Sequence, residues 1–321
     1  MKTNFEKMKF DFVKKSKYFL YVTAGLILIS LIFLCIFGLN YSIELRGGHS
    51  FSVTVGEELN TNSTFVEYSD SIKQIMNDNG LSAYSIQKQG EFVETSLYVK
   101  YSGEVDETKI QNIEIDILAE YSSLTTSDIS EHLEIEGVLT QNEIFYAYVA
   151  IVVGVVLVAL YFVFRFDVAE ALSALICVAH TILFILSLAT VTRISIGANF
   201  YAILGLMVAY TLFELNSMYE FMRNTKSNTA EIIKPNLLVN KTIKNNLLRF
   251  MFGSGVFAVV FLVMLSLGSL PIKMTAIAGI FGLVGVSVSV LFVNSYFWTF
   301  FTKILPQKNK KIKPKSKEEK A

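Results

Sequence analysis

The stretch YTLFELNSMYEFMR, residues 210–223, carries two carboxylates and an asparagine directly after a run without charged residues, 198–209. The run is long enough for the stretch to lie at least partly within a membrane-spanning helix. Glu214 then lies sixteen residues beyond Ala198, about 24 Å along the helix and past the middle of a hydrocarbon core about 30 Å thick. A carboxyl at this depth costs about 3 kcal/mol, so we expect it to face a cavity or a partner and to carry ions or protons.

The composition around this stretch is that of an integral membrane protein with one polar part. Of the 321 residues 52% are hydrophobic and only 17% are charged, and the mean hydropathy is +0.48. A helix needs about 20 apolar residues to cross a bilayer. The sequence therefore predicts an α-helical polytopic membrane protein with six transmembrane helices, at 18–38, 144–164, 169–191, 198–221, 249–268 and 273–300.

The distribution of positive charge predicts the orientation of these helices. Of the 28 lysines and arginines, 21 fall in the tail 1–17, at Arg165, in or at the end of the loop 222–248, and after residue 302. Cytoplasmic segments carry this excess in membrane proteins. We therefore expect both termini in the cytoplasm, with the loop 222–248 and a basic tail, 303–321, on the same side.

The polar part, 39–143, is expected outside the cytoplasm between the first two helices. Residues 41–143 hold 19 acidic and five basic residues, which favours a solvated acidic surface, with a cation or a basic partner as the alternative. Alternating and helical hydrophobic patterns predict a β-α-β-β-α-β order, which is that of an α+β ferredoxin-like domain. The predicted elements are 49–55, 63–80, 82–89, 93–103, 106–123 and 129–138.

Three polar groups in the apolar part are candidates for ion movement. Glu214 shares a helix face with Thr211 and Ser217, which suits a water-filled seam. His180 lies near the middle of its span, at a depth that could match Glu214, and a histidine there can relay protons. Arg249 begins the fifth span and is the obvious cation to approach the acid. The alternatives are a protonated Glu214 held for packing, a packed neutral imidazole, and an arginine that reaches the interface.

Motifs for chemistry are absent from the sequence. There is no Walker loop, no H-E-x-x-H, no G-x-S-x-G and no dinucleotide fingerprint. Cys35 and Cys177 both lie in apolar runs, so no disulfide is expected. We therefore expect neither an enzyme nor a cofactor, a metal or a nucleic-acid partner, and any work must be driven by an ion gradient or by a partner.

Five segments resemble those of one known family in order and topology. The chain resembles the SecF family, the smaller subunit of the SecDF protein-export membrane complex in the resistance-nodulation-division superfamily. The resemblance covers nearly the whole length, and each segment alone would be weak. The segments are GLNYSIELRGGHSFSV (38–53), YFVFRFDVAEALSAL (161–175), VAHTILF (178–184), AYTLFELNSMYEFMRN (209–224) and VNKTIKNNLLRFMFGSG (239–255).

The resemblance implies a function and residue roles. SecF works with SecD in the bacterial plasma membrane and uses the proton motive force, or sodium in some bacteria, to promote export of unfolded polypeptides through the SecYEG channel. Glu214 matches the family's intramembrane acid and would carry the proton. Glu220 and Arg223 match the cytoplasmic end of the same motif. Gly47 and Gly48 match its glycine turn, where the chain bends into the first strand.

The sequence departs from the family pattern at four positions. Asn245 stands where the family has its functional arginine. Arg249 follows one turn later on the same helix face, so we expect it to substitute for that arginine. Thr181 replaces an aspartate, Phe213 an asparagine and Phe221 an arginine. Two other functions stay open: a non-pumping scaffold for SecD and the channel, and a half-size exporter of lipids or drugs. Because ion sites of such transporters form between two halves, SecD is expected as the second half, with lipid around both.

Overall fold

The computed structural model divides the chain into two compact units. One unit is Met1–Asn40 with Ala147–Ala321, and the other is Tyr41–Tyr146. Parts of both predicted tails and of the loop 222–248, and residues 93, 94, 103 and 138 of two predicted strands, lie outside the described residues. The structure describes 9–56, 62–90, 95–102, 105–137, 141–228, 233–268 and 270–305.

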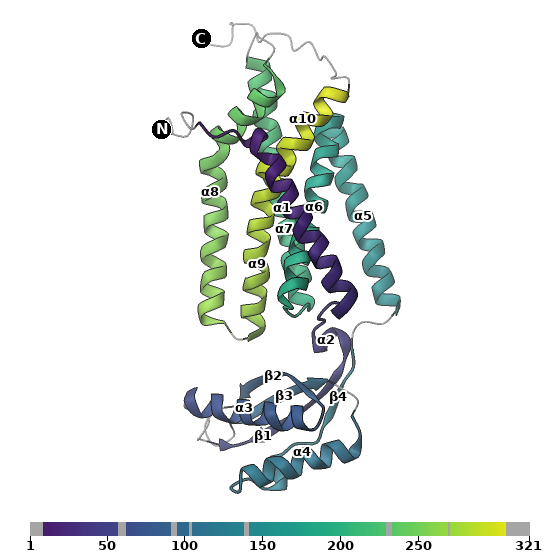
Figure 1. The fold of residues 1–321 in the computed structure, drawn as a ribbon, viewed down its shortest axis with the longest axis vertical. Coiled ribbons are helices and arrows are strands. Elements are labelled where there is room, and N and C mark those ends of the chain that lie inside the picture. Colours follow the sequence, from purple (N-terminus) through teal and green to yellow (C-terminus); the bar gives the residue numbers. More distant parts are fainter. Residues whose placement is uncertain are drawn as a thin grey trace, which may run out of the picture. The chain divides into compact units, whose positions relative to one another are not determined.

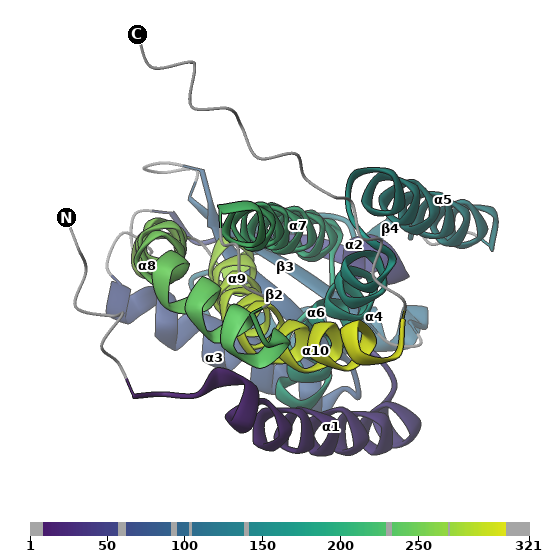
Figure 2. The same ribbon diagram turned by 90° about the horizontal axis from the view of Figure 1, so that it is seen from above.

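The first unit is a bundle of long helices. Figure 2 shows α6 and α9 between α1 on one side and α7 on the other, in agreement with the contacts among these helices. The spans formed by α6 and by α9 with α10 are the most deeply buried, whereas α1 and α8 expose most of their surface. The helices are α1 (Phe12–Phe37), α5 (Gln141–Arg165), α6 (Val168–Thr192), α7 (Ala198–Asn228), α8 (Pro235–Leu267), α9 (Leu270–Val288) and α10 (Asn294–Ile304).

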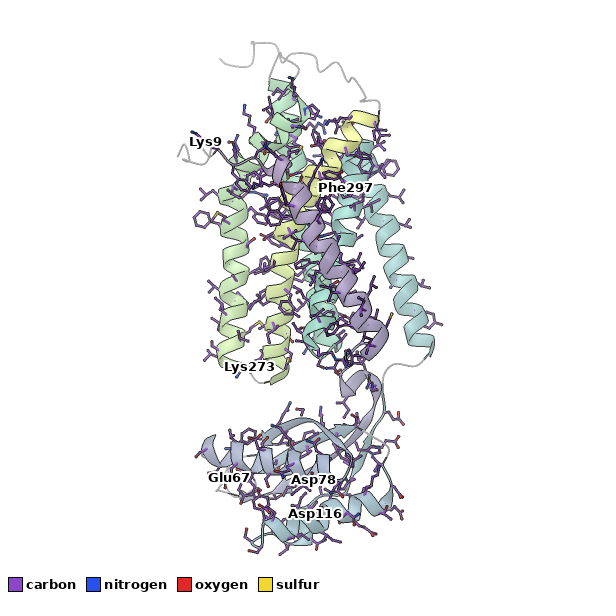
Figure 3. All side chains as sticks on the ribbon, viewed as in Figure 1. Lys9, Glu67, Asp78, Asp116, Lys273 and Phe297 are labelled. Carbon is purple, nitrogen blue, oxygen red and sulfur yellow. The ribbon has the colours of Figure 1, made fainter. Side chains whose placement is uncertain are left out.

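Five helical segments among the described residues are long and apolar enough to cross a membrane. The described part of α5 adds a shorter apolar segment, Val156–Arg165. Lys9 and Lys273 lie at opposite ends of the bundle (Figure 3). The chain is therefore a multi-pass membrane protein. The five spans are Phe12–Phe37, Val168–Thr192, Ala198–Lys226, Pro235–Leu267 and Ile272–Ile304.

Several helices are longer than the hydropathy pattern predicts. The expected loop 222–248 is mostly helical, because α7 continues to Asn228 and α8 begins at Pro235. Proline suits the first turn of a helix, since its missing N–H has no partner there in any case. The prediction placed the fifth span at 249–268 because hydropathy detects the lipid-facing part of a helix and not its polar extension.

The last span contains an irregular turn that the sequence does not predict. Residues Ser289–Val293 form a single π-helical turn between α9 and α10. Such turns insert one extra residue into a helix and are frequent at functional sites. The turn is buried, and Ser289 at its start faces α6 through three hydrogen bonds.

The second unit holds a four-stranded antiparallel sheet with strand order β2-β3-β1-β4. A short helix, α2 (Ile43–Arg46), leads into the first strand. Along the chain the strands and main helices follow the order β-α-β-β-α-β (Figure 1). Their bounds are β1 (Gly48–Thr54), α3 (Asn62–Asp78), β2 (Ser82–Gln89), β3 (Ser96–Ser102), α4 (Glu107–Glu120) and β4 (Leu133–Ile135).

One face of the sheet packs against the two helices to form the core of this unit. Alternate residues of β1 and β3, such as Phe51 and Val99, point into it and meet Ile72 of α3 and Ile113 of α4. The final strand is shorter than the expected 129–138, and Ile129 makes only an isolated bridge. Three of the acidic side chains at the unit's surface, all exposed, are labelled in Figure 3: Glu67, Asp78 and Asp116.

The glycine pair of the predicted turn lies where α2 meets β1. Gly47 has a φ of +85°, which an L side chain rarely adopts. A Cβ on Gly48 would lie 2.6 Å from Ile43 Cδ1 and 2.6 Å from the Tyr101 carbonyl oxygen. Both positions therefore need glycine, one for its backbone conformation and the other for the close approach of β3.

Candidate functional site

The candidate site is an ion pair between neighbouring helices of the bundle. Arg249 of α8 donates from Nη2 to Glu214 Oε2 of α7 at 2.7 Å. The Glu214 side chain is 5% exposed, whereas that of Arg249 is 42% exposed. A carboxylate removed from water needs a partner of this kind, because an unpaired buried charge costs several kcal/mol. The fourth and fifth predicted spans thus meet through the two residues that the sequence singled out.

The two helices come close together one turn from the ion pair. A Cβ on Gly253 of α8 would lie 2.9 Å from the Tyr210 hydroxyl oxygen and 3.8 Å from Glu214 Oε1. The Tyr210 hydroxyl in turn lies 3.0 Å from Ser254 Oγ. The absence of a side chain at Gly253 therefore lets α7 and α8 approach closely enough for the pair to form.

The surroundings of Arg249 leave one side of its guanidinium open. The guanidinium carbon lies 5.5 Å from the centre of the Phe213 ring, a cation–π contact made by the residue that replaces the family's asparagine. A cavity of about 10 Å³ beside the pair is lined by residues of α7, α8 and the π-helical turn, which is space for about one water molecule. Arginine has five N–H donors. The open side can therefore receive a further acceptor.

His180 lies in a different cluster from the ion pair. Its Nδ1 is 2.8 Å from Ser289 Oγ, and no hydrogen bond in the described part of the chain joins it to Glu214 or Arg249. Its Nε2 is buried and has no partner among the described residues. The side chains of His180 and Glu214 are therefore not in contact, although their positions in the sequence predict similar depths in the membrane. Ser289 was missed, because only the π-helical turn places it opposite the histidine.

The cytoplasmic end of the α7 motif forms an exposed ion pair. Arg165 Nη2 of α5 lies 2.7 Å from Glu220 Oε1, and both side chains are more than 40% exposed. Arg223 is exposed and forms no ion pair with another described residue. Exposed pairs of this kind contribute about 0–1 kcal/mol. This pair differs from Glu214–Arg249 in burial and not in length.

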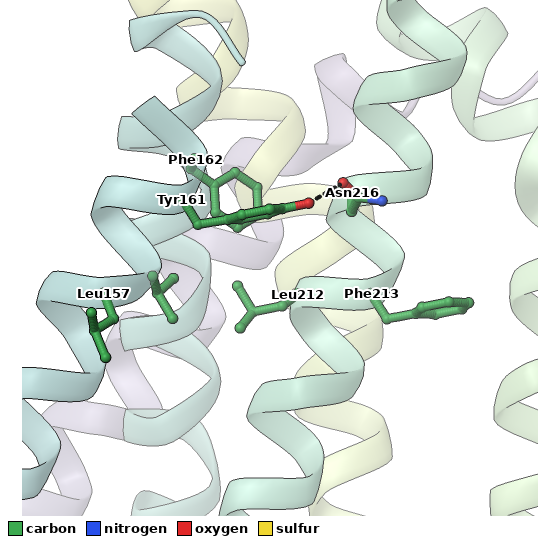
Figure 4. Close-up of a pocket in the computed structure, with 7 residues that line it drawn as sticks. Leu157, Tyr161, Phe162, Leu212, Phe213 and Asn216 are labelled. Carbon is green, nitrogen blue, oxygen red and sulfur yellow. Dashed lines mark hydrogen bonds between the residues drawn. The ribbon is translucent and has the colours of Figure 1, made fainter. Parts of the chain in front are cut away.

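An apolar groove between α5 and α7 was not predicted from the sequence. Its volume is about 410 Å³, and at one end the Tyr161 hydroxyl donates to Asn216 Oδ1 at 3.2 Å (Figure 4). Phe213 lines the groove and thus lies between it and the ion pair. No periodic pattern could have revealed the groove, because it depends on how far α5 stands from α7.

A second unpredicted cluster lies in the sheet unit. The Tyr101 hydroxyl is 2.5 Å from His132 Nδ1, and His132 stacks on Phe51 at 4.4 Å between ring centres. Burial, and the charge of His49, lower the pKa of His132 to about 4. Burial raises the pKa of Tyr101 to about 12. The histidine is therefore neutral at ordinary pH, and only knowledge of the strand register could have placed it beside Tyr101.

Fold and site together define a class of protein. The chain is a multi-pass membrane protein in which an acid on one helix pairs with an arginine on the next, and its second unit holds a small antiparallel sheet. An intramembrane acid of this kind marks proteins that move ions or protons.

The chain belongs to the SecD/SecF family of protein export membrane proteins. Residues 117–304 match the family model described as protein export membrane protein SecD/SecF, C-terminal. Over 292 residues the chain is 24% identical to the protein translocase subunit SecF of Petrotoga mobilis. The aligned region covers 89% of this chain and 93% of that protein. It is therefore a divergent SecF-like subunit.

Larger relatives contain the same fold as one part. The chain is 22% identical over 295 residues to the protein translocase subunit SecDF of Bacillus subtilis and spans 38% of it. The crystal structure of SecDF in a super-membrane-facing form matches with a TM-score of 0.69 at 18% identity, over 92% of this chain and 39% of that one. A second SecDF structure, from Thermus, gives 0.66 at 21% identity. These structures show the shared fold.

Proposed function

We propose that the protein is a SecF-like subunit of a bacterial protein translocase. Together with SecD it uses the proton motive force, or a sodium gradient, to promote passage of unfolded polypeptides through the SecYEG channel. The observation that carries this proposal is the buried carboxylate of Glu214, which is held by Arg249 from the neighbouring helix at 2.7 Å. A subunit that only held its partners together would have no need of this costly pair.

In this proposal, protonation and deprotonation of Glu214 break and restore its ion pair with Arg249. A proton that reaches Glu214 neutralises the carboxylate and removes its attraction to Arg249. The guanidinium then turns to another acceptor, and α7 and α8 are free to shift at their glycine contact. Release of the proton to the other side restores the pair. Two arrangements of the helices, biased by one proton, are what an ion-driven machine requires.

A partner half completes the site. The chain spans 39% of the SecDF structure that it matches, and the side chain of Arg249 is 42% exposed. An acidic group from SecD fits this open side, because a guanidinium inside a membrane needs more than one acceptor. SecD, the channel, the exported polypeptide and the surrounding lipid are the partners in this proposal.

The proposal includes the topology predicted from the sequence. In it α5 is the second of six transmembrane helices, both termini and the segment 222–248 are in the cytoplasm, and 39–143 is a ferredoxin-like domain outside the plasma membrane. The strand order β2-β3-β1-β4 with two helices on one face supports the ferredoxin-like assignment. The tails 1–17 and 303–321 flank the membrane segments 18–38 and 144–302.

The test is export into membrane vesicles that contain the protein, SecD and the channel, with and without an imposed proton or sodium gradient. We expect the gradient to increase the fraction of polypeptide that completes passage, and Glu214→Gln to remove that increase. Glu220→Gln is the matched control, since it removes the same charge from the same helix at an exposed pair. Equal gradient stimulation in all three proteins would show that the subunit is a scaffold.

A further inference from the structure

Two side-chain pairs join α5 to α7, and they lie four residues apart on each helix. The Tyr161 hydroxyl donates to Asn216 Oδ1 at 3.2 Å, and Arg165 Nη2 lies 2.7 Å from Glu220 Oε1. Residue numbers rise together in the two pairs, so the helices run in the same direction at this contact. The apolar groove of about 410 Å³ begins at the first pair and extends along both helices away from the second (Figure 4).

The groove has an apolar lining that the described part of the chain leaves uncovered. Leu157 and Phe213 line it and are each 61% exposed, and Leu212 points toward α5 (Figure 4). Val158 and Phe162 complete the apolar lining. The volume is within the range of sites that bind small ligands, and exposed apolar surface marks such grooves and membrane contacts. The molecule that fills the groove therefore supplies an apolar chain.

The end of the groove at Asn216 offers hydrogen-bond donors. Asn216 Oδ1 accepts from Tyr161, whereas no described residue accepts from Asn216 Nδ2. An amide nitrogen has two N–H donors, and a donor without an acceptor is unfavourable in hydrocarbon. The occupant of the groove is therefore expected to carry an acceptor oxygen at this height.

Charged groups follow one turn beyond these donors. Arg165 and Glu220 lie four residues past the Tyr161–Asn216 pair, about 6 Å along the helices. Arg223 follows three residues later on α7, is exposed and forms no ion pair with another described residue. Guanidinium groups bind phosphate through paired N–H···O bonds.

The charges at this end of the two helices sum to an excess of one positive charge. Glu220 neutralises Arg165. The next charged residues along the chain after Arg165 and Arg223 are Asp167 and Lys226, which are of opposite sign. The charge of Arg223 is therefore unmatched, and an anionic group complements it.

Apolar surface, neutral donors and positive charge thus follow one another along the groove, in the order of the acyl chain, ester carbonyl and phosphate of a glycerophospholipid. We propose that the groove binds one glycerophospholipid. Its acyl chain lies along Leu157 and Leu212. An ester carbonyl accepts from Asn216 Nδ2, and the phosphate lies against Arg165 and Arg223. The inference goes beyond the proposed function and rests on its topology, in which α5 spans the membrane.

A transmembrane helix of SecD is the other candidate occupant. The backbone carbonyls of such a helix are bonded within it, so it offers Asn216 an acceptor only through a polar side chain. It also has no phosphate for Arg223. A phospholipid supplies both groups in every molecule, so the donors at the end of the groove favour the lipid.

The first measurement is native mass spectrometry of the delipidated full chain in detergent, titrated with palmitoyl-oleoyl phosphatidylglycerol. We expect one lipid molecule to bind more tightly than all others. Diacylglycerol with the same chains lacks the phosphate, and glycerol 3-phosphate lacks the chains, so each should bind at least about tenfold more weakly. Equal affinity for diacylglycerol would overturn the phosphate contact, and equal affinity for glycerol 3-phosphate would overturn the acyl-chain site.

Variants assign the tight binding to this groove. Leu157→Trp fills the groove with a larger ring and should abolish it. Val156→Trp is the matched control, since Val156 is 51% exposed on the same helix and is not among the residues that line the groove. Arg223→Gln should weaken binding about tenfold, with Lys241→Gln, an exposed charge of α8, as its control. Unchanged binding in Leu157→Trp overturns the site, and unchanged binding in Arg223→Gln overturns the phosphate contact.

The second measurement separates the lipid from the partner helix. Leu157 is replaced by photoreactive benzoylphenylalanine, and the chain is irradiated with SecD in vesicles of the same phosphatidylglycerol. We expect an adduct with the mass of one phospholipid, in higher yield than after the same replacement of Val156. A SecD adduct, or equal lipid yields at the two positions, would show that the groove is not a lipid site. Neither measurement depends on export, so this site and the proposed function can fail separately.

Discussion

Arg249 Nη2 and Glu214 Oε2 lie 2.7 Å apart, although the two residues are separated by 35 positions in the chain. The pair is the buried counterpart of Arg165–Glu220, which has the same length at an exposed position of the same helix. Burial makes the difference, because charge interactions strengthen as water is excluded. Substitutions of the exposed Glu220 can therefore serve as controls for substitutions of the buried Glu214.

Removal of the arginine should uncouple the subunit. Arg249→Ala leaves Glu214 without its cation, so the carboxyl is expected to stay protonated and the gradient stimulation of export to be lost. Arg249→Lys keeps the charge but not the planar fork, and should retain a fraction of the activity. Export with and without a gradient measures both.

The family's arginine position gives the control for this series. Asn245 lies one turn before Arg249 and should tolerate alanine if Arg249 has taken over the role. The double variant Arg249→Ala/Asn245→Arg moves the guanidinium to the position found in the family. Loss of stimulation in Asn245→Ala, with full stimulation in Arg249→Ala, would contradict the assignment.

The close approach of α7 and α8 can be tested at one glycine. Gly253→Ala places a methyl group 2.9 Å from the Tyr210 hydroxyl oxygen, so the Tyr210 side chain, or α7 with it, must shift. We expect a cost of about 1–3 kcal/mol in stability and a weaker gradient response, because the ion pair lengthens. Gly255→Ala is the matched control, since a Cβ there meets nothing within 4 Å. Thermal unfolding in detergent measures the first effect, and equal melting temperatures for both variants would argue against it.

The fold was predictable where one physical signal dominates. Apolar runs reveal the membrane segments, and alternation reveals β1 and β3, because each pattern reflects burial directly. The bounds of α7 and α8 were not predictable from hydropathy, since their polar ends are helical without being apolar. The π-helical turn at Ser289–Val293 has no sequence signature, because it depends on how the last span packs on α6.

The part of the candidate site that depends on the spacing of residues along one helix was predictable from the sequence. Arg249 was proposed to substitute for the family's arginine because it lies one turn beyond Asn245, and in the structure it contacts Glu214. The partner of His180 was not predictable, since it depends on which helix faces α6 at that depth. The sequence predicts which residues share a face of a helix. It does not predict which residues of another helix pack against that face.

The sheet unit should lose stability in mild acid. His132 has a pKa of about 4 in the folded state, against 6.5 for the free side chain. The unfolded chain therefore binds more protons between these values, so stability is complete above about pH 6.5 and falls as the pH drops toward 4. The loss is on the order of 2 kcal/mol. Hydrogen exchange of the β1 and β3 amides in the full chain, corrected for intrinsic rates, measures it.

A histidine replacement isolates this effect. His132→Asn keeps an acceptor for the Tyr101 hydroxyl and removes the titrating group, so the exchange rates should lose most of their dependence on pH. His49→Asn is the companion variant and should keep the dependence, weakened by the loss of the His49 charge. The same acid sensitivity in His132→Asn would assign it to the carboxylates of the domain.

The glycine turn before β1 should tolerate no side chain. Gly48→Ala forces a Cβ into Ile43 and the backbone of β3, and should destabilise the sheet unit by about 1–3 kcal/mol. Gly80→Ala is the comparison, because its φ of +71° is strained but a Cβ there meets nothing within 4 Å. Limited proteolysis of the sheet unit in wild type and in both variants ranks their stabilities. Resistance of Gly48→Ala equal to that of wild type would contradict the close packing described for this turn.

Infrared difference spectroscopy can detect a proton on the Glu214 carboxyl itself. The full chain with SecD is reconstituted in vesicles, and the outer solution is acidified while the carboxyl C=O band is recorded. We expect a protonated-carboxyl band that appears in wild type and in Glu220→Gln and is absent in Glu214→Gln. No such band in wild type, or the same band in Glu214→Gln, would show that Glu214 does not take up the proton.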